Sequence, residues 1–222
     1  MPSPFGVAFK EMRKSDLLRI DHDGRVLEGG PVKLVNRAAV LIHVAVHEAR
    51  PDVNCAAHAH AIHGRALSAL RMPLLTLSQD SCAFHNDVAL FNQFEGVVVD
   101  GDEGRHIAEA MGTKKAIFLA NHGILTASDT IEATVFWFVS FNKLCKIQLD
   151  LMAAVGGDIS RLYQIDPDVA RKYGARIVSC SSLRVLTDDR TYANIGTPAA
   201  GWFSAKPLFD EVAVATNEAY LA

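Results

Sequence analysis

The sequence predicts a single α/β domain in which helices flank a central, mainly antiparallel sheet. Half of its 222 residues are apolar, which suits one compact domain with a sizeable core. Short apolar runs that end at polar turns indicate strands, and two pairs of these runs, at 17–27 and 116–126, have the pattern of hairpins. Longer stretches with apolar residues at helical spacing lie between the strands.

The first predicted elements are a hairpin, with strands at 17–20 and 25–27, and a helix. The Asp-His-Asp-Gly between the two strands supplies residues that tolerate the unusual backbone angles of a tight turn. A helix over 36–49 should follow, with Asn36 as its cap and Pro51 just beyond its end.

The same predicted helix carries His43 and His47 four residues apart, on one face with Val40 and Val44. Histidines at this spacing are able to bind a metal ion, but the glutamate of a His-Glu-x-x-His motif is absent. We therefore interpret them as packing or interface residues, with metal ligation as the less favoured alternative.

A buried strand at 53–57 should run directly into a helix of small residues at 61–70. His58 and His60 lie where this strand ends, and residues two apart in a strand share one face. Two imidazoles in this arrangement bind one metal ion if a third ligand arrives from elsewhere. The alternative is a pair of half-buried histidines that only form hydrogen bonds.

The candidate for the third ligand is His122. Apolar runs at 116–120 and 124–126 predict two strands, and the Asn-His-Gly between them predicts a tight turn with glycine supplying conformational freedom. His122 should then be displayed at the tip of the turn. A histidine there has little structural purpose, so the metal-ligand interpretation is favoured.

The remaining predicted elements are strands at 74–77 and 95–99, a helix at 103–111, and a long helix from a capping box at Asp129 to about Ala154. The long helix has apolar residues on nearly all of its sides. We therefore expect it to be buried under the sheet and against a neighbouring subunit.

Two histidine motifs at this separation resemble the class II aldolase/adducin family. They are His-Ala-His-Ala-Ile-His after Arg-Pro-Asp-Val-Asn, at 50–63, and Ala-Asn-His-Gly-Ile-Leu at 120–125. The resemblance runs from about Pro4 to Ala154. The family includes metal-dependent sugar-phosphate aldolases and epimerases, a thioribulose-phosphate dehydratase and the non-catalytic adducin head domain.

The resemblance implies that His58, His60 and His122 hold one divalent metal ion, with zinc favoured and Fe(II) as the alternative. It also implies a small-molecule substrate and a homotetramer. Such an ion would polarise a carbonyl or enediolate oxygen and stabilise its developing negative charge.

The sequence departs from the family pattern at its expected acid/base residue. The place of the family's early catalytic glutamate is Ala39 here, and alanine cannot transfer a proton. The dehydratase branch uses instead a glutamate preceded by glutamine, and Asp80 after Gln79 matches that place after a two-residue gap. We predict Asp80 as the proton relay, with His85 as a weaker candidate for substrate contact. The alternative is that Asp80 only forms a turn or caps a helix.

A second departure concerns the N-terminus. The family normally has a helix and a Gly-Asn-Ile-Ser-type anion-binding loop before the first predicted hairpin, and this chain begins just after them. We divide the chain into a catalytic domain at 1–155 and a C-terminal extension at 156–222 that packs on the domain or on a neighbouring subunit. Glycine and proline at 196–203 argue against a regular helix throughout that stretch, and Trp202 and Phe203 are its expected anchors.

Three functions are compatible with these residues. The first is a metal-dependent lyase that performs aldol cleavage, dehydration or decarboxylation on a small oxo- or hydroxy-acid or ketose. The second is a non-haem Fe(II) oxygenase, because the chain is also similar to aldolase-like enzymes of aminocoumarin biosynthesis that cleave the side chains of aromatic oxo-acids. The third is an adducin-like binding module, which the retained histidine trio argues against.

Composition excludes other classes of partner. A net charge of −3 without runs of basic residues argues against nucleic acid. Four cysteines without Cys-x-x-Cys spacing, and no recognisable signal peptide, favour reduced thiols and a cytoplasmic location. No apolar run is long enough to cross a bilayer, so we expect no membrane contact.

Overall fold

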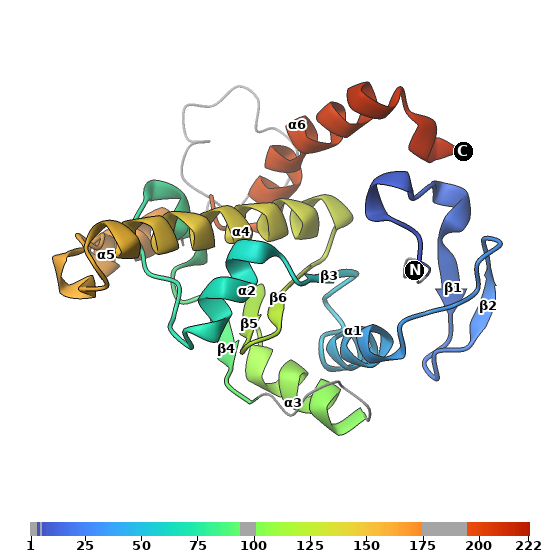
Figure 1. The fold of residues 1–222 in the computed structure, drawn as a ribbon, viewed down its shortest axis with the longest axis horizontal. Helices are drawn as coiled ribbons and strands as arrows, with labels where there is room; N and C mark the ends of the chain where they lie inside the picture. Colours follow the sequence, from blue (N-terminus) through green and yellow to red (C-terminus); the bar gives the residue numbers. More distant parts are fainter. Residues whose placement is uncertain (1–3, 5, 94–100, 175–194) are drawn as a thin grey trace. The chain divides into compact units, whose positions relative to one another are not determined.

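The computed structural model describes residues 4, 6–93, 101–174 and 195–222 (Figure 1). These residues group into two compact units. One contains the chain up to Pro51 together with Glu95–Glu109 and Lys206–Ala222, and the other contains Asp52–Phe94 and Ala110–Ala205. The predicted strand at 95–99 lies outside the described residues.

The first unit contains the predicted hairpin. Strand β1 (Leu18–Ile20) pairs antiparallel with β2 (Val26–Gly29). Helix α1 (Arg37–Ala49) begins as predicted, because the Asn36 side chain accepts hydrogen bonds from the first-turn backbone N–H groups of Ala38 and Ala39 at 3.1 and 3.4 Å.

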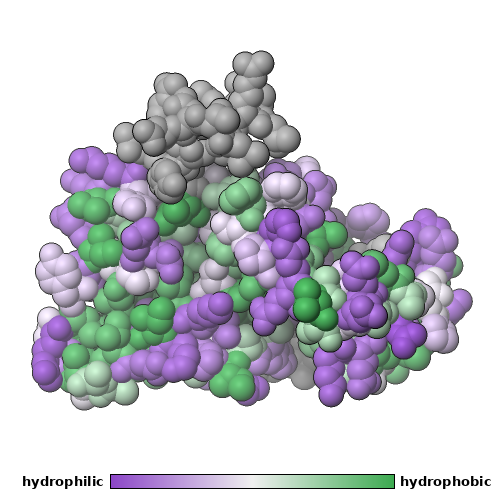
Figure 2. Space-filling model, turned by 90° about the horizontal axis from the view of Figure 1, so that it is seen from above, coloured by the Kyte–Doolittle hydropathy of each residue, from purple (hydrophilic) through white to green (hydrophobic). Residues whose placement is uncertain are grey.

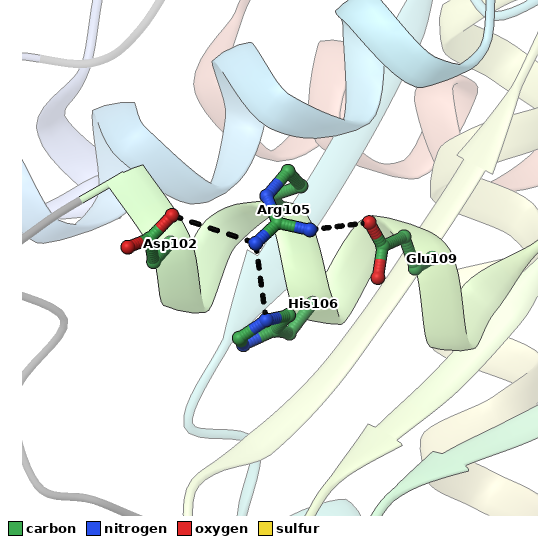
Figure 3. A network of polar contacts seen from close by, with 4 residues as sticks. All are labelled: Asp102, Arg105, His106 and Glu109. Atoms are coloured by element: carbon green, nitrogen blue, oxygen red, sulfur yellow. Dashed lines mark hydrogen bonds and ion pairs between the residues drawn. The ribbon is translucent and has the colours of Figure 1, made fainter.

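Helix α3 (Gly101–Met111) confirms the helix predicted at 103–111, and Gly112 follows it with φ of 54°. On this helix Arg105 donates to Glu109 at 2.6 Å and lies 3.5 Å from Asp102 and 3.2 Å from the His106 ring (Figure 3). Because these side chains are exposed, solvent and salt screen the network and it adds little to helix stability.

The second unit is built on a four-stranded sheet in the order β3–β6–β5–β4. Its strands are β3 (Cys55–Ala59), β4 (Val88–Phe91), β5 (Ala116–Leu119) and β6 (Gly123–Ser128). The β3–β6 and β6–β5 pairs are antiparallel and the β5–β4 pair is parallel. The prediction of an α/β fold with a mainly antiparallel sheet is therefore confirmed.

Helices α2 (Ile62–Ala69) and α4 (Ile131–Ala154) contact each other and strand β6 (Figure 1). Their shared core is aromatic: the Phe141 ring lies 4.6 Å from that of Phe118 and 5.5 Å from that of Phe84. Strands β5 and β6 are buried along their whole length, which explains why β5 is a continuous apolar run and β6 is mostly apolar, with Thr126 and Ser128 as its buried polar residues.

Helix α4 differs from its prediction in two respects. Its cap is Thr130, whose side chain accepts from the N–H of Ala133 at 3.3 Å, rather than Asp129. Its second half also has a polar side, where Lys146 forms an ion pair with Asp150. The expectation of apolar residues on nearly all sides is therefore wrong for this half, and cover by a neighbouring subunit stays a prediction.

The stretch at 74–77 is not a strand. Its backbone is held by other groups: the buried Gln148 side chain accepts from Leu75 N–H at 2.8 Å and donates to Pro73 O at 3.1 Å. Thr76 O accepts from the N–H of Ile165 at 2.9 Å. These bonds replace the ladder that a strand requires. The strand in this region is β4, a short apolar run that was not among the predicted elements.

The C-terminal part contains α5 (Pro167–Gly174) and α6 (Pro198–Thr216). The stretch at 196–203 is not helical throughout, as predicted, but the helix already begins at Pro198, because proline is tolerated in a first turn. Gly201 faces the core, where a Cβ would lie 2.8 Å from the Trp137 ring. Trp202 and Phe203 are 48% and 64% exposed, so they do not anchor the segment within the described chain, and their packing on a neighbouring subunit stays a prediction.

Short 3-10 helices complete the described chain; they are η1 (Phe9–Glu11), η2 (Lys14–Asp16), η3 (Gln79–Phe84), η4 (Ile159–Arg161) and η6 (Ala219–Leu221). In the part of the chain that the structure describes, no helix combines the length and the hydropathy that a membrane span needs.

Candidate metal centre

Strand β3 brings the first two histidines to one edge of the sheet. It begins and ends two residues later than predicted, so His58 lies within the strand, opposite Leu125 of β6, and His60 follows its last residue. Both residues still alternate onto one side of the chain, as the two-residue period requires. His58 is half-buried and His60 is exposed.

The third histidine comes from the β5–β6 turn, which has a different construction from the predicted one. Asn121, not the glycine, takes the left-handed conformation, with φ of 58°. Gly123 is needed for a close approach, because a Cβ there would lie 2.7 Å from the carbonyl oxygen of Ala59. The N–H of His122 donates to Leu119 O at 3.0 Å, and its side chain is half-buried.

The three rings face one another in a nearly equilateral triangle. Their centroids are 5.5 Å apart for His58–His60, 4.8 Å for His58–His122 and 4.7 Å for His60–His122, with interplanar angles of 70–79°. One nitrogen from each ring lies within 4.8 Å of the others. A tetrahedral zinc ion with bonds of about 2.1 Å separates its nitrogens by about 3.4 Å, so modest ring movements would bring these into range.

The protonation of the rings also fits a metal. The Nδ1 atom of His58 lies 3.0 Å from Ile124 O, and because a carbonyl only accepts, this nitrogen carries the proton. Its Nε2 is then the ring nitrogen that carries the lone pair, which is the tautomer that a second hydrogen bond usually fixes in metal-binding histidines. Burial, and secondly the nearby His60, lower the pKa of His122, so its ring is neutral at pH 7.

The predicted acid/base residues lie outside this cluster. Asp80 is exposed in the first turn of η3, where Ser78 is the cap, and His85 Nδ1 lies 3.4 Å from the Thr76 hydroxyl oxygen. Among the described residues, the potential metal-binding group contains the three histidines and no carboxylate. Asp80 also does not follow a strand, because the stretch at 74–77 is not one.

The other histidine pair gathers no such group. The described residues place no third ligand beside His43 and His47 on α1. Burial lowers the pKa of His43 to about 4, with His47 adding to the effect, so His43 is neutral at pH 7. This state agrees with the packing interpretation.

Sequence reasoning missed two polar contacts around the site. Arg71, just after α2, donates from its Nη2 to the side-chain oxygen of Asn121 at 3.3 Å. Asn142 of α4 accepts from Gly64 N–H at 3.0 Å and lies 3.5 Å from Nδ1 of His63. Both contacts join residues at least 50 positions apart, and no local pattern in the sequence indicates either of them.

Comparison with known proteins identifies the family of this chain. A family model for the Class II Aldolase and Adducin N-terminal domain matches residues 2–149. The chain belongs to the class II aldolase and adducin family. The solved structure of an L-fuculose 1-phosphate aldolase from Glaciozyma antarctica PI12 is similar to this family member, with a TM-score of 0.80 and 36% identity, over 99% of this chain and 76% of that one.

Two Streptomyces relatives in the class II aldolase family carry enzyme names. One, from Streptomyces roseochromogenus subsp. oscitans, is a 4-hydroxy-3-prenylphenylpyruvate oxygenase/4-hydroxy-3-prenylbenzoate synthase, 34% identical over 94% of this chain and 66% of its own length. The other is decarboxylase NovR of Streptomyces niveus, 35% identical over 94% of this chain and 68% of its own length. The chain thus spans about two thirds of each relative.

Proposed function

We propose that this class II aldolase family member is a metal-dependent lyase acting on a small oxo- or hydroxy-acid or ketose. The observation that carries the proposal is the convergence of His58 and His60, at the end of β3, with His122, in the β5–β6 turn. A divalent ion bound there, zinc in the first instance, would polarise a carbonyl oxygen of the substrate and stabilise the negative charge that develops on it.

Neighbouring groups in the chain orient the histidine rings and keep them in the neutral state that binds a metal ion. The carbonyl of Ile124 fixes the ring of His58, and burial keeps His122 neutral, so both rings offer lone pairs without first losing a proton. Three protein ligands leave at least one position open, which distinguishes catalytic from structural sites. The substrate's oxygen atoms would occupy that open position.

Proton transfer in this mechanism needs a titratable group within reach of the substrate. We keep Asp80 as the proposed proton relay and His85 as a substrate contact, because the chain has alanine where the family's early glutamate would be. Asp80 is exposed, and a carboxylate needs hydrogen-bond reach of the substrate, directly or through one water molecule. Substrate binding would have to bring the two together.

The exposed position of Asp80 favours a second candidate, a non-haem Fe(II) oxygenase. Such an enzyme does not depend on a carboxylate that shuttles protons, and three imidazoles with open positions suit Fe(II). The relative named as an oxygenase of a prenylated phenylpyruvate supports the same class of substrate, an aromatic 2-oxo acid.

One experiment separates the candidates. Metal content of the freshly purified protein is measured by mass spectrometry, and turnover of 4-hydroxyphenylpyruvate and pyruvate is followed with and without oxygen in an oxygen electrode. Zinc with oxygen-independent turnover supports the lyase, whereas iron with stoichiometric oxygen uptake supports the oxygenase. Metal-free protein contradicts both and leaves an adducin-like binding module.

Substitution of a ligand tests the metal site itself. His122→Ala should lose stoichiometric metal, because it removes one of the three proposed ligands. Its circular dichroism spectrum should stay unchanged, because the strands on both sides of this turn are buried and keep their packing. His106→Ala, which removes an exposed histidine of α3, is the matched control and should keep the metal. Full metal content in the His122 variant would refute the assignment.

We also propose that the family member assembles as a homotetramer. Large apolar side chains remain at its surface, including Ile62 at 71%, Ile131 at 61% and Tyr163 at 92% exposure. The face displayed in Figure 2 likewise carries apolar residues among polar ones. Sedimentation equilibrium at micromolar concentration checks the assembly, and a stable monomer would contradict it.

A further inference from the structure

The residue after helix α2 has a backbone conformation that its side chain disfavours. Arg71 has φ of 53°, in the left-handed region, and its N–H closes the end of the helix by donating to Ser68 O at 3.1 Å. Glycine is the usual residue in this position because it has no Cβ to crowd the backbone. An arginine held in this conformation therefore suggests a role for its side chain.

The Arg71 side chain reaches the turn that carries the third histidine. Its Nη2 donates to the Asn121 side-chain oxygen at 3.3 Å, across 50 residues of sequence. Asn121 directly precedes His122 and is itself left-handed, with φ of 58°. Among the described residues, Arg71 forms no ion pair with a carboxylate. The contact with Asn121 is thus the interaction that orients the guanidinium.

The rest of the turn is held only at its base. Ala120 N–H donates to Phe91 O and His122 N–H donates to Leu119 O, both at 3.0 Å, and these bonds tie the turn to the sheet. Asn121, at the tip, is exposed. In the part of the chain that the structure describes, the side-chain contact recorded for Asn121 is the one with Arg71.

We propose that Arg71 is a positioning residue for the metal centre, acting through Asn121 to fix the turn that presents His122. This inference rests on the proposed metal site, and it assigns to Arg71 no contact with substrate. Residues that orient metal ligands from outside the coordination sphere change affinity by about 10- to 100-fold when they are removed. Because this hydrogen bond is exposed, we expect the lower part of that range or slightly less.

The test uses glycine at both left-handed positions. Arg71→Gly, Asn121→Gly and the double variant each keep or relax the backbone conformation, so that they delete the side-chain contact without adding strain. Binding of Co²⁺ to the metal-free protein is followed by the visible absorption of the bound ion, and thermal unfolding is measured in parallel.

We expect each single variant to bind Co²⁺ about five- to tenfold more weakly, and the double variant to be no weaker than either, because the two side chains act through one bond. The thermal stability of the variants should not fall, because glycine tolerates the left-handed conformation. If Arg71 had only a structural role, the stability would rise on substitution by glycine and the Co²⁺ affinity would stay unchanged. Arg71→Lys, which keeps a cationic donor, should recover part of the affinity.

Two results would overturn the inference in distinguishable ways. If the unsubstituted protein binds Co²⁺ and all variants bind it equally, Arg71 has no positioning role and the proposed metal site stands. If the unsubstituted protein does not bind Co²⁺, the metal site and the inference fail together.

Discussion

Replacing Gly123 by alanine should weaken metal binding at the proposed centre as well as destabilise the fold. Gly123 is the first residue of β6; it follows His122 in the sequence and packs against the end of β3. A Cβ added there would lie 2.7 Å from Ala59 O and 3.4 Å from the Cα of His60. Both neighbours are backbone atoms, which cannot rotate away. Restoring an ordinary contact of 3.4 Å requires the two strands to separate by about 0.7 Å at this point.

That displacement can be converted into two magnitudes. Overpacking of this kind typically costs about 1–3 kcal/mol of unfolding free energy. Metal sites, however, tolerate ligand distances only within about 0.2 Å of the ideal, and the displacement falls between the histidines of β3 and the histidine of the turn. We therefore expect Co²⁺ or Zn²⁺ to bind at least about tenfold more weakly, a loss of about 1.4 kcal/mol.

Affinity is measured by competition with a chelator, and stability by urea unfolding of the metal-free protein. Gly201→Ala is the matched control, because its Cβ would meet the Trp137 ring at 2.8 Å, a similar clash in the same unit between α6 and α4. The control should lose stability and keep its metal affinity. Unchanged metal affinity in Gly123→Ala would refute the reasoning.

Three further predictions concern single side chains. Asp80→Asn should lower turnover about a hundredfold with metal content unchanged if Asp80 relays protons, whereas unchanged turnover would favour the oxygenase. The pKa of His43 is about 4 in the folded protein and about 6.5 in the unfolded chain, so the free energy of unfolding should fall by about 1–3 kcal/mol as the pH falls from 6.5 to 4. In urea unfolding at these pH values, His43→Gln should not show this loss. Lys115→Met should cost about 2–3 kcal/mol in urea unfolding, since it leaves the half-exposed Asp87 without its buried partner; equal stability would contradict this.

The sequence was most informative where one residue type has one physical use. The two histidine motifs predicted a cluster that the structure brings together, because strand periodicity and a two-strand hairpin leave few other arrangements. Asn36 likewise marked the start of α1, since an N-cap needs only its own first turn.

Predictions failed where distant residues decide the local structure. The run at 74–77 has the composition of a strand, but the buried amide of Gln148 takes its hydrogen bonds. Gly201 looked like a helix breaker, but its missing Cβ lets α6 pack on Trp137. Neither Gln148 nor Trp137 is within 50 residues of its partner, so no local pattern could indicate the contact.

The side chain of Lys115 links two segments of the second unit that lie far apart in the sequence, at Asp87 and at Gly196. Its ammonium is buried 4.4 Å from the centre of the Trp137 ring, pairs with Asp87 at 3.0 Å and donates to Gly196 O at 2.8 Å. Burial lowers its pKa, opposed by Asp87. A fragment that ended near residue 149, where the family match stops, would lack the Gly196 carbonyl and leave a buried cation short of an acceptor. The four-stranded sheet and the segment that contains Gly196 should therefore fold and unfold together.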